Sequence, residues 1–98
     1  MYKHKARLTP RRREILILIA KGYNNDEISK AMGLSIMNTK LQKWRLYCYL
    51  GGIHSALDAV YMGLQQGLLD MRDLSEAIRE KLYDRLNQKQ KHSYIQTR

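Results

Sequence analysis

Apolar residues recur along this chain at intervals of three or four positions, and short stretches containing glycine, asparagine or serine separate the runs. This spacing puts them on one face of a helix, whereas a half-buried strand would alternate apolar and polar residues. No stretch shows that alternation. The pattern predicts an all-α protein with helices at residues 9–22, 24–33, 35–50 and 55–67, and a last one from 73 or 75 to about 88.

The ends of these helices carry residues that satisfy free backbone groups. Thr9 is a good N-cap, and Pro10 suits the first helical position, where its missing N–H costs nothing. Asn24, with Glu27 three residues later, is close to a capping box, and Gly33 can end the same helix. The expected inward positions are Ile15, Leu16 and Ile19, then Ile28, Ala31 and Met32, and in the third helix Thr39, Leu46 and Leu50.

The fifth helix has an apolar stripe, and the tail after it is polar. Leu74, Ile78, Leu82 and Leu86 recur at every fourth position with charged residues between them. We expect this stripe either to pack on the first helix or to mediate self-association. Residues 89–98 should fray.

Charge adds an expectation about the partner. The 98 residues carry a net charge of +9, and residues 1–13 hold six basic residues and no acid. Such an excess attracts phosphate backbones or anionic membrane surfaces. The acidic residues beside the stripe of the fifth helix argue against a membrane. We therefore expect a nucleic acid as the partner, and the helix-turn-helix expected within residues 24–50 makes double-stranded DNA the expected form.

Several classes of function lack their minimal signature. The single cysteine, Cys48, has no partner for a disulfide or a zinc site, and His4, His54 and His92 are isolated, so we expect no metal and no cofactor. No glycine-rich phosphate loop or nucleophile elbow is present, which argues against an enzyme. No signal peptide or membrane span is recognisable, so we expect a cytoplasmic protein.

The second and third helices form the motif that carries the expected function. They are joined by the tight turn Ala31-Met32-Gly33-Leu34-Ser35. Two helices joined in this way have the geometry that places the second one, here residues 35–50, in the major groove of DNA.

The chain resembles the LuxR-type helix-turn-helix family over most of residues 8–69. The resemblance rests on Leu8-Thr9-Pro10-Arg11, Arg13-Glu14-Ile15-Leu16, Leu18-Ile19-Ala20-Lys21-Gly22, Asn25, Glu27-Ile28, Gly33-Leu34-Ser35, Lys40, Leu50, Ser55, Ala59-Val60 and Gly67-Leu68. It implies a four-helix LuxR-type domain at residues 9–69, after a basic arm at 1–8 and before an extra C-terminal amphipathic helix with a frayed tail at 70–98.

The resemblance also implies a bacterial or phage transcription regulator without an attached sensor domain, in which the third helix reads DNA and the fourth forms a homodimer. Lys40 matches a lysine that contacts DNA, Leu41 and Trp44 match positions that face base edges, and Gln42 stands where a phosphate-contacting histidine is common. The expected DNA-binding set is Lys40, Leu41, Gln42, Lys43, Trp44, Arg11, Arg12, Arg13 and Asn25.

Three features leave alternatives open. The arginines Arg11, Arg12 and Arg13 meet phosphate or form a solvated arm. Trp44 belongs to the core, lies against a thymine methyl or a sugar, or anchors a protein partner. The aromatic third helix allows a different function, a module that binds another regulator or RNA polymerase. Its candidate residues are Trp44, Tyr47, Tyr49, Leu74, Ile78 and Leu82. A third and weaker hypothesis is that the chain is a promoter-recognition fragment like the last region of sigma factors.

Overall fold

The computed structural model describes the backbone of residues 7–96 and the side chains of residues 7–88. It contains the helices α1 (Pro10–Ala20), α2 (Asn25–Met32), α3 (Ile36–Tyr49), α4 (Ala56–Gln65) and α5 (Glu76–Gln96), with a short 3-10 helix, η1 (Met71–Asp73), before α5. The described residues form no strand. The predicted all-α class and the five helices are confirmed.

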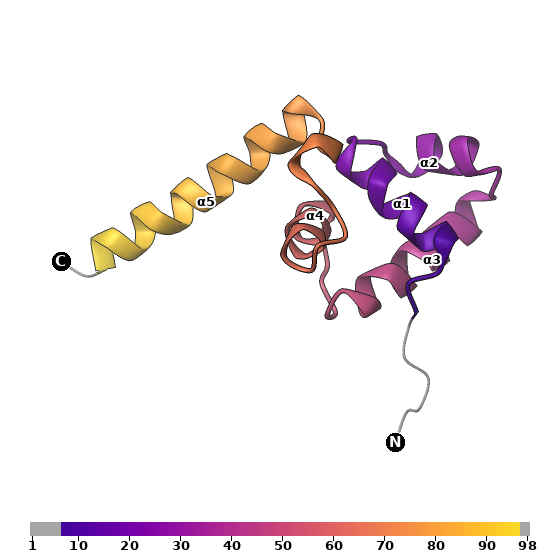
Figure 1. Cartoon of the computed structure of the whole chain (residues 1–98), viewed down its shortest axis with the longest axis horizontal. Helices are drawn as coiled ribbons and strands as arrows, with labels where there is room; N and C mark the ends of the chain where they lie inside the picture. The colour runs from indigo at the N-terminus through magenta and orange to yellow at the C-terminus, as the bar shows by residue number, and fades with distance from the viewer. Residues whose placement is uncertain (1–6, 97–98) are drawn as a thin grey trace, which may run out of the picture.

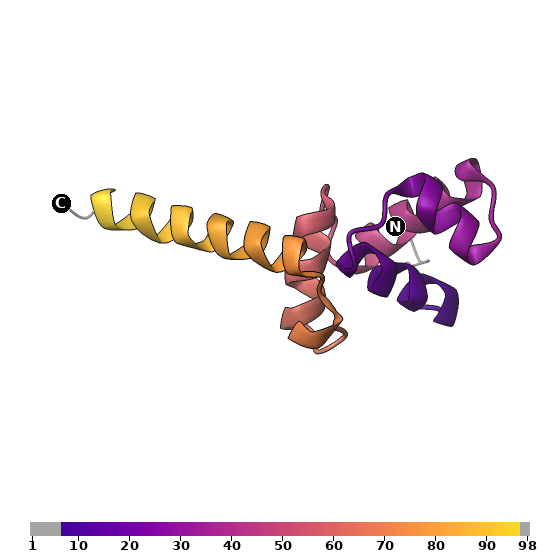
Figure 2. The same ribbon diagram turned by 90° about the horizontal axis from the view of Figure 1, so that it is seen from above.

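The first four helices form a cluster from which α5 projects. α1 packs against α2, α3 and α4, and α2 packs against α3, while α5 packs against α4. Figures 1 and 2 show that α5 leaves this cluster on the side opposite α2 and α3. α1 is therefore the central helix, and α5 extends the molecule without enclosing the other helices.

The helices begin where their capping side chains indicated. Thr9 Oγ1 accepts a hydrogen bond from the Arg12 backbone N–H at 3.2 Å. Asn24 and Glu27 form the full capping box, with N···O distances of 2.8 and 2.9 Å. Gly33 then takes a left-handed conformation with φ of 68°, which a side chain would strain. These local contacts produce the tight turn between α2 and α3.

One apolar core joins the helices. It includes the expected Ile15, Leu16, Ile19, Ile28, Leu46 and Leu50. Thr39 is also fully buried, and its hydroxyl donates to the Ser35 carbonyl at 2.9 Å, so this polar side chain is satisfied within its own helix. Ala31, which we expected in the core, is exposed because α2 turns that position away from α1 and α3.

Most of the apolar stripe that we expected on the last helix is part of the core, and its first member, Leu74, lies just before α5. Leu74, Ile78 and Leu82 are buried by the chain itself, which corrects their assignment as interaction residues, whereas Leu86 is 36% exposed. The Ser75 N–H donates to the Ala20 carbonyl at 3.0 Å, so the start of α5 is attached to the end of α1. Burying these side chains between α1 and α4 removes their apolar area from water.

α5 continues to Gln96, past the residue 88 at which we expected it to fray. Residues 89–96 contain no proline or glycine that would end a helix. No helix in the described part of the chain combines the length and the apolar character needed to cross a bilayer.

Candidate nucleic-acid interface

α3 presents one face to the core and the opposite face to solvent. It packs against α1 and α2, and Thr39, Leu46 and the C-capping Leu50 are fully buried. On the opposite face, Met37 is 81% exposed, Leu41 43% and Trp44 63%. Trp44 is therefore not a core residue. Since α5 projects from the other side of the cluster, it does not cover this face (Figure 1).

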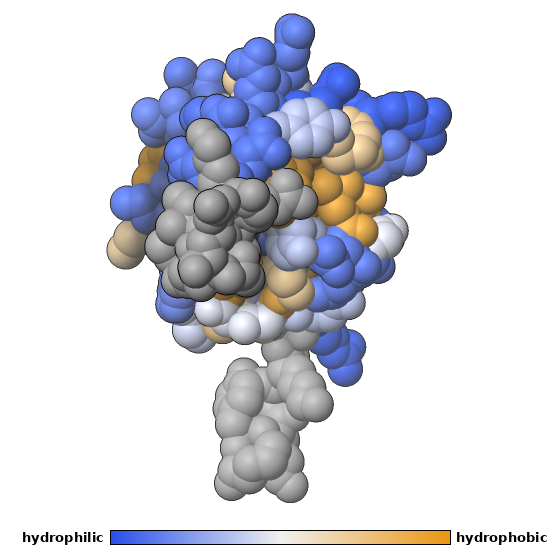
Figure 3. All heavy atoms as spheres, turned by 90° about the vertical axis from the view of Figure 1, so that its left-hand side faces the viewer, coloured by the Kyte–Doolittle hydropathy of each residue, from blue (hydrophilic) through white to orange (hydrophobic). Residues whose placement is uncertain are grey.

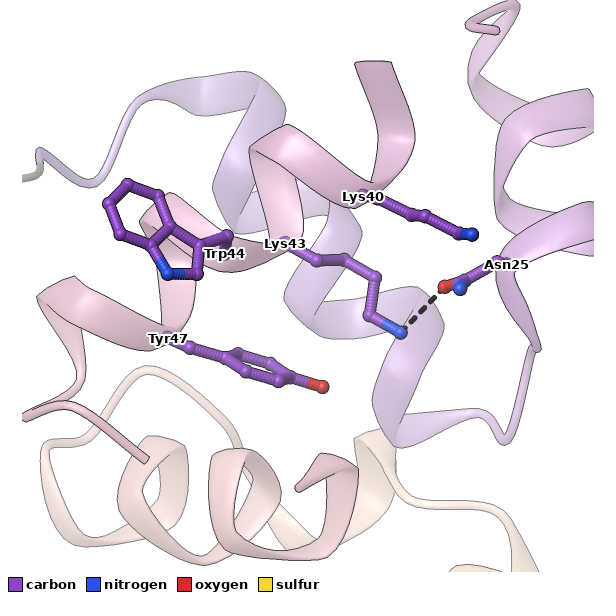
Figure 4. Close-up of a pocket in the computed structure, with 5 residues that line it drawn as sticks. All are labelled: Asn25, Lys40, Lys43, Trp44 and Tyr47. Carbon is purple, nitrogen blue, oxygen red and sulfur yellow. Dashed lines mark hydrogen bonds between the residues drawn. The ribbon is translucent and has the colours of Figure 1, made fainter. Parts of the chain in front are cut away.

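A shallow recess of about 230 Å³ borders the exposed face on the side of α2. It is lined by Asn25 of α2 and by Lys40, Lys43, Trp44 and Tyr47 of α3. In Figure 4, both lysine side chains point toward Asn25, while Trp44 points away from it. The structure thus brings four members of the expected DNA-binding set to one place, and adds Tyr47 from the protein-interaction set.

Lys43 is the most constrained residue of this recess. Its Nζ donates to Asn25 Oδ1 at 2.7 Å and lies 5.9 Å from the centroid of the Tyr47 ring. Partial burial lowers the pKa of Lys43 and raises the pKa of Tyr47, since the charged form of each is poorly solvated there. Lys43 therefore links α2 to α3, and the exposed Lys40 is the freer cation.

On the opposite border of the face, Arg12 of α1 reaches α3. Its Nε donates to Gln42 Oε1 at 2.9 Å, and its Nη1 donates to the Arg7 carbonyl at 2.8 Å. Gln42 Nε2 in turn donates to Asn38 Oδ1 at 3.3 Å. Burial, and secondly the charge of Arg45, lower the pKa of Arg12. A chain of polar groups thus runs from α1 along α3.

The three arginines at positions 11–13 have different environments, although we expected all three to contact phosphate. Arg11 and Arg13 are exposed at the start of α1, whereas Arg12 is only 9% exposed. Because the Arg12 side chain is largely buried and its Nε and Nη1 already donate to protein oxygens, we expect Arg12 to position Gln42 and no longer assign it a phosphate contact.

Two residues of this face, Met37 and Asn38, were not among those predicted from the sequence. Met37 lies one helical turn before Leu41, and that spacing, on the side opposite Thr39, was the signal that could have found it. Asn38 became relevant only through its contact with Gln42. Tyr49, from the protein-interaction set, is 37% exposed near the end of α3.

The described residues contain no group of histidine, cysteine, aspartate or glutamate side chains that could hold a metal ion. What the interface offers is an exposed helix face with lysine and amide side chains along its borders. α3 carries Lys40, Lys43 and Arg45 and no acidic residue. Its charge therefore favours an anionic partner.

Comparison with protein-family models matches residues 6–62 to the family described as bacterial regulatory proteins, luxR family. Comparisons with curated proteins and with solved structures returned no match. The family match covers more than half of the chain and includes all of α1, α2 and α3. The chain belongs to the LuxR family of bacterial regulatory proteins, whose helix-turn-helix domains bind DNA.

Proposed function

We propose that this protein is a sequence-specific transcription regulator that inserts α3 into the major groove of duplex DNA. The observation that carries the proposal is the free face of α3, which α1 and α2 hold outward, on a helix that has three basic residues and no acidic one. A helix of this kind fits the major groove, and the basic residues beside it neutralise phosphates.

The side chains have different roles in this proposal. Lys40, Arg11 and Arg13 are exposed and contact phosphates, which sets the position of the domain on the duplex. Leu41 and Trp44 face the base edges. Asn25 and Lys43 hold the edge of the recess, and Gln42, oriented by Arg12, presents its amide at the other border.

Titration of duplex DNA at several salt concentrations tests the proposal. Binding that neutralises phosphates weakens as salt rises, and the plot of log affinity against log salt is linear. Lys40→Ala should flatten its slope by about 1, since one phosphate contact is lost. Lys81→Ala is the matched control, because Lys81 is exposed on α5, away from the interface. Affinity that is independent of salt would contradict phosphate contact.

A second candidate function is a module that binds another regulator or RNA polymerase through α3. The observation that favours it is the strong exposure of Trp44 and Met37, because large apolar side chains often anchor protein interfaces. Pull-down from a bacterial lysate with the wild-type protein and with Trp44→Ala, combined with a DNA-binding assay of both, distinguishes the two functions. A partner retained only by wild type, in the absence of any DNA affinity, would favour this candidate.

We also propose that the protein acts as a homodimer, which would match two half-sites on DNA. Tyr61 of α4 is 38% exposed, and Tyr83 and Leu86 of α5 are 53% and 36% exposed. Apolar side chains gather on the side of the molecule from which α5 projects (Figure 3). These features support pairing through α4 and α5.

Sedimentation equilibrium over a range of protein concentrations tests the pairing. We expect a dimer whose fraction rises with concentration, and Leu86→Asp should shift it to monomer by placing a charge in the interface. Leu41→Asp serves as the control, since it places the same charge on α3. A wild-type protein that remains monomeric at all concentrations would exclude this pairing.

A further inference from the structure

The exposed face of α3 has an apolar stripe at its centre. Met37, Leu41 and Trp44 are 81%, 43% and 63% exposed and follow one another at intervals of four and three residues. This spacing aligns them along the helix axis, on the side opposite the buried Thr39 and Leu46. Water therefore contacts a continuous row of large apolar side chains in the part of the molecule that would face DNA.

Polar groups border the stripe on both sides. Lys40 lies on the side of the recess, together with Lys43 and Asn25. Asn38 and Gln42 lie on the other side, where their hydrogen bond to each other engages Asn38 Oδ1 and leaves the Asn38 amino group as a donor. The borders can contact phosphates and base acceptors, but the centre has no group that donates or accepts a hydrogen bond except the indole N–H.

The chemistry of the stripe limits what it can recognise. An apolar side chain cannot distinguish bases through hydrogen bonds, and in the major groove of unmodified DNA the one apolar group on a base edge is the C5-methyl of thymine. The lysines on one border of the stripe favour an anionic partner. A duplex that carries thymine methyls in its major groove meets both requirements.

The length of the stripe also fits the spacing of base pairs in duplex DNA. Met37 and Trp44 are seven residues apart, which corresponds to about 10 Å along a helix that rises about 1.5 Å per residue. Base pairs stack about 3.4 Å apart, so the stripe spans roughly three base-pair steps. Two or three thymine methyls can lie along it.

We propose that Met37, Leu41 and Trp44 recognise thymine by packing against C5-methyl groups, so that the protein selects thymine-containing sites mainly through apolar contacts. This inference rests on the proposed function, since it requires α3 to enter the major groove. It adds a specificity that the family match does not assign, and it gives Met37 a role in recognition.

The experiment replaces thymine by deoxyuridine, which pairs identically but lacks the methyl group. A duplex is first selected by the full-length protein from a random pool, and its thymines are then replaced one at a time. We expect affinity to fall roughly fourfold for each contacted methyl that is removed, as the transfer free energy of a methyl group predicts. Where a contacted thymine is changed to cytosine, 5-methylcytosine should restore part of the affinity.

Variants of the protein show which side chain contacts each thymine methyl group. Leu41→Ala and Met37→Ala should bind the thymine duplex more weakly and lose the difference between thymine and deoxyuridine at one position each. Lys40→Ala should weaken binding to both duplexes by the same factor. Tyr23→Ala is the control for an exposed aromatic side chain outside the stripe and the proposed dimer contact, and it should leave affinity and discrimination unchanged.

Each contrary outcome has a separate meaning. If a duplex is selected and binds equally well with thymine or deoxyuridine at every position, the inference is overturned and the proposed function stands. If no duplex is selected, the proposed function fails as well. If purified bacterial RNA polymerase is retained by wild type but not by Leu41→Ala, and no discrimination is seen, the stripe is a protein-docking face and the inference is overturned.

Discussion

Arg12 Nε donates to Gln42 Oε1 at 2.9 Å and so joins the first turn of α1 to the middle of α3, 30 positions later in the sequence. The same guanidinium donates to the Arg7 carbonyl at 2.8 Å. A planar group with donors in a fixed geometry orients its acceptors more strictly than an ammonium can. Arg12 therefore controls which way the Gln42 amide faces at the edge of the candidate interface.

Arg12→Ala should destabilise the fold, while Arg11→Ala should not. Removing Arg12 breaks hydrogen bonds from a charged, buried group and should lower the free energy of unfolding by about 2 kcal/mol. Exposed Arg11 should change it by less than about 0.5 kcal/mol. Urea denaturation followed by circular dichroism measures both.

For DNA binding we expect the reverse order, with a larger effect of Arg11→Ala than of Arg12→Ala on the salt dependence. Arg11→Ala should reduce the salt dependence of binding by about one phosphate contact. Arg12→Ala should leave that slope unchanged at temperatures where the variant is folded. A reduced slope in Arg12→Ala would mean that its guanidinium contacts phosphate after all.

Trp44 should report DNA binding directly, because it is the only tryptophan in the chain and is 63% exposed on α3. Saturation with a selected duplex should shift its emission to shorter wavelengths and protect it from acrylamide quenching, since docking removes the indole from water. Free tryptophan mixed with the same duplex is the control. Unchanged quenching, with binding detected by anisotropy of labelled DNA, would place Trp44 outside the interface.

Gly63→Ala should destabilise the protein, although alanine is the better helix former by about 1 kcal/mol. A Cβ at this buried position of α4 would lie 2.7 Å from Leu69 Cδ1 and 3.3 Å from Leu16 Cδ2. Overpacking of this kind costs about 1–3 kcal/mol, so we expect a net loss of about 1 kcal/mol. Urea denaturation measures it. Leu69→Ala removes the side chain that the new Cβ would meet, so in the double variant the free-energy changes of the two single substitutions should not simply add. Strict additivity would contradict overpacking as the cause.

Tyr47 should make stability fall at alkaline pH. Burial raises its pKa in the folded protein, so the native state keeps the phenol proton at pH values where the unfolded chain loses it. This contribution is complete below the ordinary tyrosine pKa of about 10 and is lost as pH rises through the folded value. The free energy of unfolding should therefore decline with rising pH more steeply in wild type than in Tyr47→Phe.

The difference between these two proteins removes the contribution of the other titrating groups, including Lys43, whose lowered pKa acts in the opposite direction. Absorbance titration of tyrosinate gives an independent measurement. Tyr47→Phe should lack a component that titrates above the ordinary tyrosine pKa of about 10. Identical stability profiles for the two proteins would show that the Tyr47 phenol is as well solvated in the folded state as in the unfolded one.

The sequence alone was sufficient to predict where the helices begin, which residues form the helix-turn-helix and which family the chain resembles. The reason is that capping is local. The Asn24 side chain bonds a backbone group three residues away, and Gly33 ends α2 through its own backbone conformation. The inward positions Leu46 and Leu50 follow from helical periodicity for the same reason.

Only the tertiary structure decided how neighbouring residues of one type divide between core and surface. Arg11, Arg12 and Arg13 are chemically equal in the sequence, but successive residues of a helix differ in direction by about 100°, and the acceptor for Arg12 comes from a distant helix. Likewise, the sequence allows Leu74 and Ile78 to form an exposed contact stripe, but in the structure α4 and the end of α1 cover them. Burial depends on which segments meet in space, and periodicity within one helix does not contain that information.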